Sequence, residues 1–156
     1  YIYVCVCDLC PFLTLTSSLI PYLHLLLTTL EGISRAGCEA FAKTLITMTA
    51  LTNLDLSSNA VCCDGAIAIA EAVRSESCPL LRLNLSGNRI KVRGAAEVVR
   101  ASISEHSKLI YLSLTNNLIR KEGRAELASI AGYNYSNRCV CIYTYIYMSL
   151  FHASSR

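Results

Sequence analysis

The sequence predicts an α/β solenoid, a short horseshoe arc with parallel strands on its concave face and helices on its convex face. Three observations lead to this fold class. A leucine-containing pattern recurs over residues 51–61, 80–90 and 109–119, each copy 29 residues after the previous one. A glycine follows each copy at the same interval, and a helical pattern of apolar residues follows each glycine. A fixed period in this range is typical of solenoids, whose stacked repeats share one core.

Each copy contains a short run in which apolar and polar residues alternate, and this run predicts a strand with one buried face. The predicted strands cover residues 54–56, 83–85 and 112–114. Two inward leucines in each strand are too few to form a core. The strands are therefore expected to stack as a parallel sheet, which joins their leucines into one apolar column.

An asparagine follows the second strand leucine by three residues in every copy, as Asn59, Asn88 and Asn117. A side-chain amide both donates and accepts hydrogen bonds, so it can satisfy backbone groups where the chain turns out of the strand. We interpret these three residues as structural and not as a binding site.

A helix is expected after each of the glycines Gly65, Gly94 and Gly123, because apolar residues follow them at helical spacing. The first set is Ala66, Ile69, Ala70 and Val73, and the second is Ala95, Val98 and Val99, with Ser102 in the fourth place. The third set is Leu127, Ala128 and Ala131. Such a face makes each helix amphipathic, so the helices are expected to cover the sheet.

The spacing of leucine, asparagine and glycine over about residues 33–131 resembles the leucine-rich repeat in its ribonuclease-inhibitor-like form, with repeats of 28–29 residues. The resemblance implies the fold above and, less specifically, the binding of other proteins. A degenerate fourth copy covers residues 26–50, where Gly37 continues the glycine series and Leu26 takes the first strand-leucine place. Thr28 and Glu31 replace the second leucine and the asparagine. Three to four repeats predict marginal stability, or a fragment of a longer solenoid.

The two ends differ from the repeats, which we place at residues 26–132. Residues 1–30 contain one charged side chain, Asp8, and residues 139–156 contain one, Arg156. The segment 1–25 has three interpretations. It is an apolar cap of the solenoid, or most of it belongs to a membrane anchor at residues 9–27, or it is a spurious translation of the nucleotide repeats TATA and TGTG. The apolar tail 133–156 shares the last interpretation, and its alternating residues could alternatively form one more edge strand.

The nine cysteines, an odd number in a repeat protein, do not predict a disulfide framework. We expect buried free thiols, a reducing compartment and a cytoplasmic location. No metal is expected, because Cys5, Cys7 and Cys10 have no fourth ligand paired with them. No catalytic group is predicted either, because the histidines lie far apart and no phosphate-binding loop is present. The sequence therefore favours a non-catalytic protein without a cofactor.

The outward positions of the strands are the candidate binding surface, because solenoids bind partners on their concave faces. The first repeat contributes Asn53, Asp55, Ser57 and Ser58, the second contributes Arg82, Asn84 and Ser86, and the third contributes Tyr111, Ser113 and Thr115. Stacking predicts a column of Asn53, Arg82 and Tyr111 beside a column of Asp55, Asn84 and Ser113. Arg82 and Tyr111 are the predicted anchors, because arginine and tyrosine are favoured at interfaces.

A second candidate surface is the basic edge between strand and helix in the second and third repeats. Its residues are Arg89, Lys91, Arg93, Arg120, Lys121 and Arg124. They are candidates for contacts with an acidic partner, although Glu97, Glu122 and Glu126 nearby also fit a solvated edge. Nucleic-acid binding is not favoured, because the net charge is only +3 and aromatic residues do not interleave with the basic ones.

The sequence thus favours an interaction module, a repeat scaffold that binds a protein of unknown identity. Two alternatives remain. The first alternative is a regulatory fragment, because Ran GTPase-activating proteins and nucleotide-binding immune receptors carry similar repeats. The second is a membrane-anchored repeat protein held by residues 9–27.

Overall fold

The computed structural model describes residues 2–3, 24–26, 35–132 and 141–143. Helices and strands alternate through the long central segment. The helices are α1 (Arg35–Leu45), α2 (Cys63–Val73), α3 (Val92–Ser102) and α4 (Lys121–Gly132). The central strands are β3 (Asn53–Asp55), β4 (Arg82–Asn84) and β5 (Tyr111–Ser113), and the outer strands are β1 (Ile2–Tyr3), β2 (His24–Leu26) and β6 (Cys141–Tyr143).

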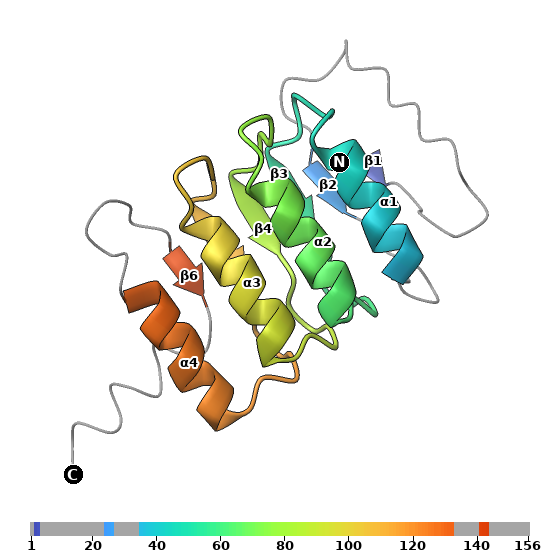
Figure 1. The fold of residues 1–156 in the computed structure, drawn as a ribbon. Helices are drawn as coiled ribbons and strands as arrows, with labels where there is room; N and C mark the ends of the chain where they lie inside the picture. Colours follow the sequence, from blue (N-terminus) through green and yellow to red (C-terminus); the bar gives the residue numbers. More distant parts are fainter. Residues whose placement is uncertain (1, 4–23, 27–34, 133–140, 144–156) are drawn as a thin grey trace.

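The six strands form one parallel sheet in which each strand pairs with its neighbours in sequence order. Leu54 lies opposite Leu83, and Leu83 lies opposite Leu112, so the central register follows the sequence repeat. Figure 1 shows the four helices side by side on one face of this sheet. The predicted α/β leucine-rich-repeat arc is therefore confirmed.

The core lies between the sheet and the helices and consists of the leucines that the repeat places inward. Leu54, Leu83 and Leu112 are at most 2% exposed, and so are the second leucines of the strands, Leu56, Leu85 and Leu114. Ile69, Val98 and Leu127 bury the same core from the helices. Each fully buried aliphatic side chain contributes roughly 1.5–3 kcal/mol relative to an exposed one, so the columns provide most of the driving force for stacking.

The strands and helices begin slightly earlier than expected. Each central strand starts one residue before its first leucine, although the ladder continues beyond it, since the Leu56 amide donates to the Asn84 carbonyl at 2.8 Å. Helix α2 begins two residues before Gly65, because the Ala66 amide already bonds the Cys62 carbonyl at 3.0 Å. The glycines thus lie inside the first helical turn and do not open it, which corrects that part of the prediction.

The asparagines bond backbone groups at the turns, and two of them, Asn88 and Asn117, also join successive repeats. The Asn88 amide nitrogen donates to the Leu85 carbonyl of its own repeat at 3.0 Å and to the Leu56 carbonyl of the preceding repeat at 2.9 Å. Its oxygen accepts the Val61 amide at 3.0 Å. Asn117 repeats these contacts one repeat later, with Leu85 at 2.8 Å and Ile90 at 3.1 Å. Asn59 donates to the carbonyls of Leu56 and Ser57 within its own repeat, both at 3.1 Å. All three asparagines thus bond backbone groups where the chain leaves the strand, as their structural interpretation expected.

The sheet also pairs with segments outside the three strong repeats. Leu25, and not Leu26, lies opposite Leu54, so strand β2 keeps the 29-residue step. The segment between β2 and helix α1 is therefore one residue longer than in the later repeats, and the segment between α1 and β3 is one residue shorter. This corrects the alignment of Leu26 with Leu54. At the other end, strand β6 places Ile142 opposite Leu112. The alternating tail residues therefore add the edge strand that was one of the alternatives for residues 133–156.

Most of the two ends lies outside the described residues, including the candidate anchor at residues 9–23 and 27. The last part of that candidate, His24–Leu26, is strand β2. Within the described part of the chain, no helix has the length and apolar character needed to cross a membrane. The domain boundaries at residues 25 and 132 stay a prediction.

Candidate functional site

The strand register brings the predicted concave residues together in columns. Asn53 lies opposite Arg82, and Arg82 lies opposite Tyr111. Asp55, Asn84 and Ser113 form the neighbouring column in the same way. The spatial grouping expected from the repeat is thus present on one face of the sheet, and the columns differ in how far their side chains are already engaged.

The first column contains a cation–π pair. The guanidinium carbon of Arg82 lies 4.7 Å from the centroid of the Tyr111 ring. Arg82 is exposed, while Tyr111 and Asn53 are half-buried. Stacking on the ring limits the rotamers of Arg82 while its guanidinium keeps donors in solvent. The column therefore presents an ordered positive charge beside an aromatic ring.

The second column is bonded within itself. The Asn84 amide donates to the Asp55 Oδ2 atom at 3.1 Å, and the Ser57 amide donates to the other carboxylate oxygen at 2.8 Å. The Asn84 oxygen accepts both the amide of Ser86 at 3.1 Å and its hydroxyl at 2.7 Å. Ser113 is only 5% exposed. These groups hold the strand ends in place, and they offer fewer free donors and acceptors than the sequence suggested.

The remaining outward residues, Ser57, Ser86 and Thr115, follow the strand ends and are half-buried. The hydroxyl oxygens of Ser113 and Thr115 lie 3.4 Å apart, which again joins neighbouring polar groups on one strand. Ser58 is exposed and has a positive φ of 56°, a backbone conformation suited to the turn. The candidate site therefore narrows to the first column.

Two exposed aliphatic residues beside that column were missed by the sequence reasoning. Leu81 is 36% exposed and Ile110 is 52% exposed, and they directly precede strands β4 and β5. Their backbones are paired, because the Ile110 amide donates to the Leu81 carbonyl at 2.8 Å. Alternation with Leu83 and Leu112 suggests that they face inward. The sequence contains one indication that this position faces solvent: the first repeat has a polar residue, Thr52, at the same place.

We call Leu81, Arg82, Ile110 and Tyr111 the strand-start patch. It combines two exposed aliphatic side chains with a cation–π pair at adjacent positions of two neighbouring strands. Aromatic, arginine and aliphatic groups that can be desolvated together are typical of the residues that dominate protein interfaces. The patch has the composition of such an interface centre.

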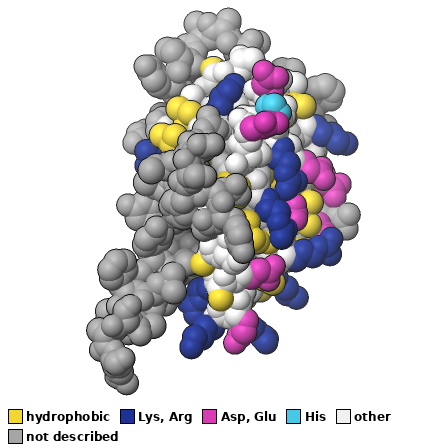
Figure 2. Space-filling view, turned by 60° about the vertical axis from the view of Figure 1, so that its left-hand side comes forward, with side chains coloured by type: hydrophobic (Ala, Val, Ile, Leu, Met, Phe, Trp, Pro, Cys, Tyr) yellow, Lys and Arg dark blue, Asp and Glu magenta, His cyan; other side chains and the backbone are white. Residues whose placement is uncertain are grey.

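The basic edge lies at the end of the molecule where helices α2, α3 and α4 begin. Arg89, Lys91, Arg93, Arg120 and Lys121 are all exposed, and Arg124 is half-buried. Figure 2 shows Lys and Arg side chains at the lower end of the described surface and along its helical side, where Asp and Glu side chains alternate with them. Ion pairs within residues 35–132 include those of Glu97 with Arg74 and Arg100, and His106 lies 3.2 Å from Glu105.

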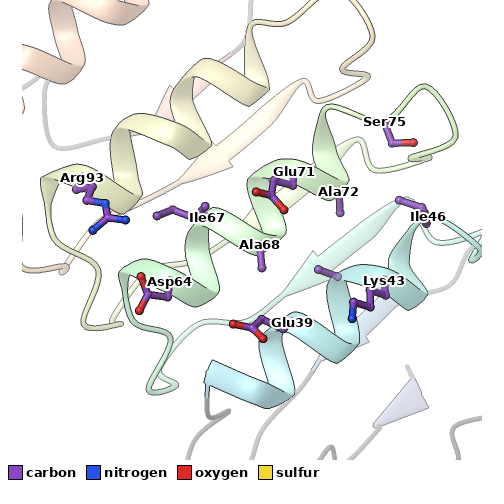
Figure 3. Close-up of a pocket in the computed structure, with 11 residues that line it drawn as sticks. Glu39, Lys43, Ile46, Asp64, Ile67, Ala68, Glu71, Ala72, Ser75 and Arg93 are labelled. Atoms are coloured by element: carbon purple, nitrogen blue, oxygen red, sulfur yellow. The ribbon is translucent and has the colours of Figure 1, made fainter.

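A third surface feature is a groove of about 540 Å³ on the convex side, between helices α1 and α2. Figure 3 shows Glu39 and Lys43 on one helix facing Asp64 and Glu71 on the other, with Arg93 at one end. Its floor is made of small residues, including Ala42 and Ala68. Opposite charges share the rim, so the groove presents no single charge to a partner.

The thiols described by the structure are free. Burial raises the pKa of the Cys38 thiol to about 12, with further contributions from nearby Cys62 and Glu39. Burial also raises the pKa of the Cys78 thiol. Among the described residues, no cluster of three or more His, Cys, Asp or Glu side chains could hold a metal ion. Cys5, Cys7 and Cys10 lie outside the described residues.

Comparison with known proteins agrees with this geometry. Residues 76–99, which include strand β4 and most of helix α3, match the family model for the leucine-rich repeat. The match covers about one repeat of the chain and agrees with the leucine-rich-repeat arc of the fold. A solved structure of "Leiomodin-1 Actin-Binding Site 2 (ABS2)" superimposes with a TM-score of 0.62 at 16% identity, covering 87% of this chain and 79% of that one. At this identity the likeness shows the fold alone. The search of curated proteins gives no match.

Proposed function

We propose that the chain is a non-catalytic interaction module that binds a protein partner on its concave face, with the strand-start patch as the centre of the interface. The observation that carries this proposal is the Arg82–Tyr111 pair, held at 4.7 Å beside the exposed Leu81 and Ile110. Strands β4 and β5 are paired with each other, so these side chains already lie next to one another before a partner binds. A fixed anchor loses little conformational entropy on binding, and this favours affinity.

The composition of the patch indicates the chemistry of its partner. Leu81 and Ile110 supply exposed apolar area whose removal from water is favourable when a partner covers it. The Arg82 guanidinium supplies donors for a carboxylate or a backbone carbonyl. The second column, centred on the bonded pair Asp55 and Asn84, contributes complementarity and not an anchor. A partner surface with an apolar residue beside an acidic one fits this arrangement.

Actin is one protein to test, because the similar leiomodin-1 structure is named as an actin-binding site. The other finer interpretations belong to the same proposal. We propose the ribonuclease-inhibitor-like subclass because the repeats have a period of 28–29 residues. We also propose a cytoplasmic location, which the free thiols of the described cysteines support. A regulatory role like that of Ran GTPase-activating proteins is the alternative function, and a GTP-hydrolysis assay separates it from simple binding.

The test is quantitative affinity capture with the full chain, compared with the double variant Arg82→Ala/Tyr111→Ala. The matched control is Lys43→Ala/Lys108→Ala, which removes exposed side chains from helix α1 and from the segment before β5. Partners that are lost with the patch variant and kept with the control support the proposal, and purified actin is tested by cosedimentation with the same three proteins. An unchanged partner set with both variants would reject the concave-face site.

A further inference from the structure

The turns of the second and third repeats form a surface pocket at the basic edge. The Leu118 amide donates to the Ile90 carbonyl at 2.9 Å, and Lys91 forms a parallel bridge with Leu118. These bonds fix the two turns side by side and leave a pocket of about 580 Å³. We call it the turn pocket, and its lining residues are Lys91, Val92, Asn117, Leu118, Ile119, Arg120, Glu122 and Gly123.

One wall of the turn pocket is apolar. Leu118 is 55% exposed, the largest exposure among the exposed large hydrophobic residues of the described chain. Val92 and Ile119 are half-buried and line the same pocket. A single exposed leucine is ordinary, but one held on a paired backbone beside two further aliphatic side chains offers a fixed apolar contact.

The rim of the turn pocket is basic. Lys91 and Arg120 line it, and Arg89, Arg93 and Lys121 adjoin them in sequence. All five are exposed, and Glu122 is the one acidic residue in the lining. Arg120 occupies the position in the third repeat that Lys91 occupies in the second. The two cations therefore lie on neighbouring turns and flank the same apolar wall. An anionic partner gains both a faster encounter and charge-assisted hydrogen bonds here.

We propose that the turn pocket is a second docking site, which binds an acidic peptide segment whose aliphatic side chain packs against Leu118 while its carboxylates bond Lys91 and Arg120. Charge complementarity selects the acidic sequence, and the apolar wall selects an aliphatic residue within it. This site is independent of the strand-start patch, because it follows the strands in sequence whereas Leu81 and Ile110 precede them.

A nucleic acid fits the turn pocket less well. Proteins that bind single strands stack bases on aromatic side chains, and none of the eight lining residues is aromatic. A phosphate backbone would also leave Leu118 without an apolar partner. The discriminating property is therefore the dependence of binding on Leu118, which a purely electrostatic ligand does not share.

The experiment measures fluorescence anisotropy of a fluorescein-labelled peptide, DEDLEDLDED, with the full chain at physiological ionic strength. Its control peptide, DEDSEDSDED, keeps the charge and lacks the leucines. The protein variants are Leu118→Ser and Lys91→Glu/Arg120→Glu. The matched controls are Ile46→Ser, another exposed aliphatic residue, and Lys43→Glu/Lys108→Glu, which makes the same change in net charge. Circular dichroism checks the fold of each variant, and Lys91→Gln/Arg120→Gln replaces the charge reversal if that variant unfolds.

We expect the leucine peptide to bind the wild-type chain, and the pocket charge reversal to weaken it by about tenfold or more. Leu118→Ser is expected to weaken it by about fivefold, to the level of the serine peptide, while both matched controls bind as the wild type does. Equal losses in the pocket and control charge reversals would overturn the proposal, and so would no binding. Full competition by oligouridylate RNA together with an unchanged affinity of Leu118→Ser would assign the basic edge to nucleic acid instead.

Discussion

Arg82 and Tyr111 lie at paired positions of strands β4 and β5, with the guanidinium carbon of Arg82 4.7 Å from the centroid of the Tyr111 ring. The two residues come from different repeats. Their contact therefore exists only when the repeats stack, and it joins the stability of the array to the shape of the proposed interface.

We predict that this pair is energetically coupled. A double-mutant cycle with Arg82→Ala, Tyr111→Ala and the double variant should give a coupling free energy of about 0.5–1 kcal/mol, as expected of an exposed cation–π pair. Urea unfolding followed by circular dichroism measures each term. Additive effects of the two single changes would show that the ring only supports the sheet, and would weaken Arg82 as a preordered anchor.

The asparagine links should be the most sensitive polar positions of the array. Asn88 is 4% exposed and bonds the carbonyls of Leu56 and Leu85 and the amide of Val61. Asn88→Ala removes the acceptor of the Val61 amide and one of the two side-chain donors to each of the Leu56 and Leu85 carbonyls, which keep Asn59 and Asn117. We therefore expect a loss of roughly 1–3 kcal/mol in the free energy of unfolding. Urea denaturation provides the measurement.

Two controls identify the cause of that loss. Asn88→Asp keeps the shape and the acceptor for Val61 but turns a carboxylate oxygen toward the carbonyls of Leu56 and Leu85. It should destabilise at neutral pH at least as much as alanine does. Asn117→Ala, at a half-buried site one repeat later, should cost less. Equal effects at both asparagines, with a stable Asn88→Asp protein, would contradict the role of donation between repeats.

The turns after the strands should tolerate glycine better than serine. Ser58, Gly87 and Asn116 occupy the same place in three successive repeats and have φ angles of 56°, 67° and 54°. Positive φ is strained for most residues and permitted for glycine. We expect Ser58→Gly to raise the midpoint of thermal unfolding, with a gain of roughly 0.5–1 kcal/mol, and Gly87→Ala to lower it. A midpoint reduced by Ser58→Gly would mean that side-chain contacts outweigh the backbone strain.

The sequence repeat was sufficient to predict the parallel sheet, the inward leucines and the bonding of the asparagines to turn backbone groups, because each depends on a residue type repeated at one spacing. It was also sufficient to group the outward residues into columns. It did not predict that Asn88 and Asn117 reach the preceding repeat. It did not predict that Asp55 and Asn84 bond each other, since the choice between a partner in solvent and one in the next repeat depends on side-chain rotamers.

The two exposed aliphatic residues of the strand-start patch were missed for a related reason. Leu81 and Ile110 continue the alternation of Leu83 and Leu112, and the alternation rule holds only where the chain is already extended within the strand. The register of the outer strands depends on the lengths of the connections between strands and helices. The spacing of the glycines gives only the total length of a repeat and not how that length is divided between the connections. This is why Leu25 and not Leu26 lies opposite Leu54.

The glycines in the first helical turns should resist replacement because the preceding repeat is close. A Cβ atom added to Gly94 would lie 2.9 Å from the Cα atom and 3.0 Å from the carbonyl oxygen of Cys63. Helix propensity alone favours Gly94→Ala by about 1 kcal/mol, but overpacking against backbone should outweigh it and give a net loss. The matched change is Gly123→Ala, whose Cβ would lie 2.8 Å from Cγ2 and 2.9 Å from Cβ of Val92, so it meets a side chain at the start of α3 and no backbone atom.

Differential scanning calorimetry of the two glycine variants tests the order of these effects. Gly94→Ala should unfold at a lower temperature than Gly123→Ala. The reverse order would show that the first turn of α3 moves away from Cys63 more easily than the first turn of α4 moves away from Val92.

The last prediction concerns pH. Glu97 on α3 is 2.6 Å from Arg74, the residue that follows α2, and 2.6 Å from Arg100. The hydrogen bond from Arg74, followed by that from Arg100, holds the pKa of the Glu97 carboxyl below its ordinary value of 4.5, although partial burial opposes the shift. A lowered folded-state pKa means that the ion pair stabilises the protein fully above pH 4.5 and loses this contribution as the pH falls through the folded-state pKa.

We therefore expect the wild-type chain to be more stable than Glu97→Gln at neutral pH by about 1 kcal/mol or less, because the side chains of this triad are 30–47% exposed. The difference should shrink below pH 4.5 and also in high salt. Urea unfolding across this pH range measures it, with Glu71→Gln on α2 as the control for loss of one negative charge. A difference that stays constant with pH would mean that Glu97 stabilises the α2–α3 contact through packing and not through its charge.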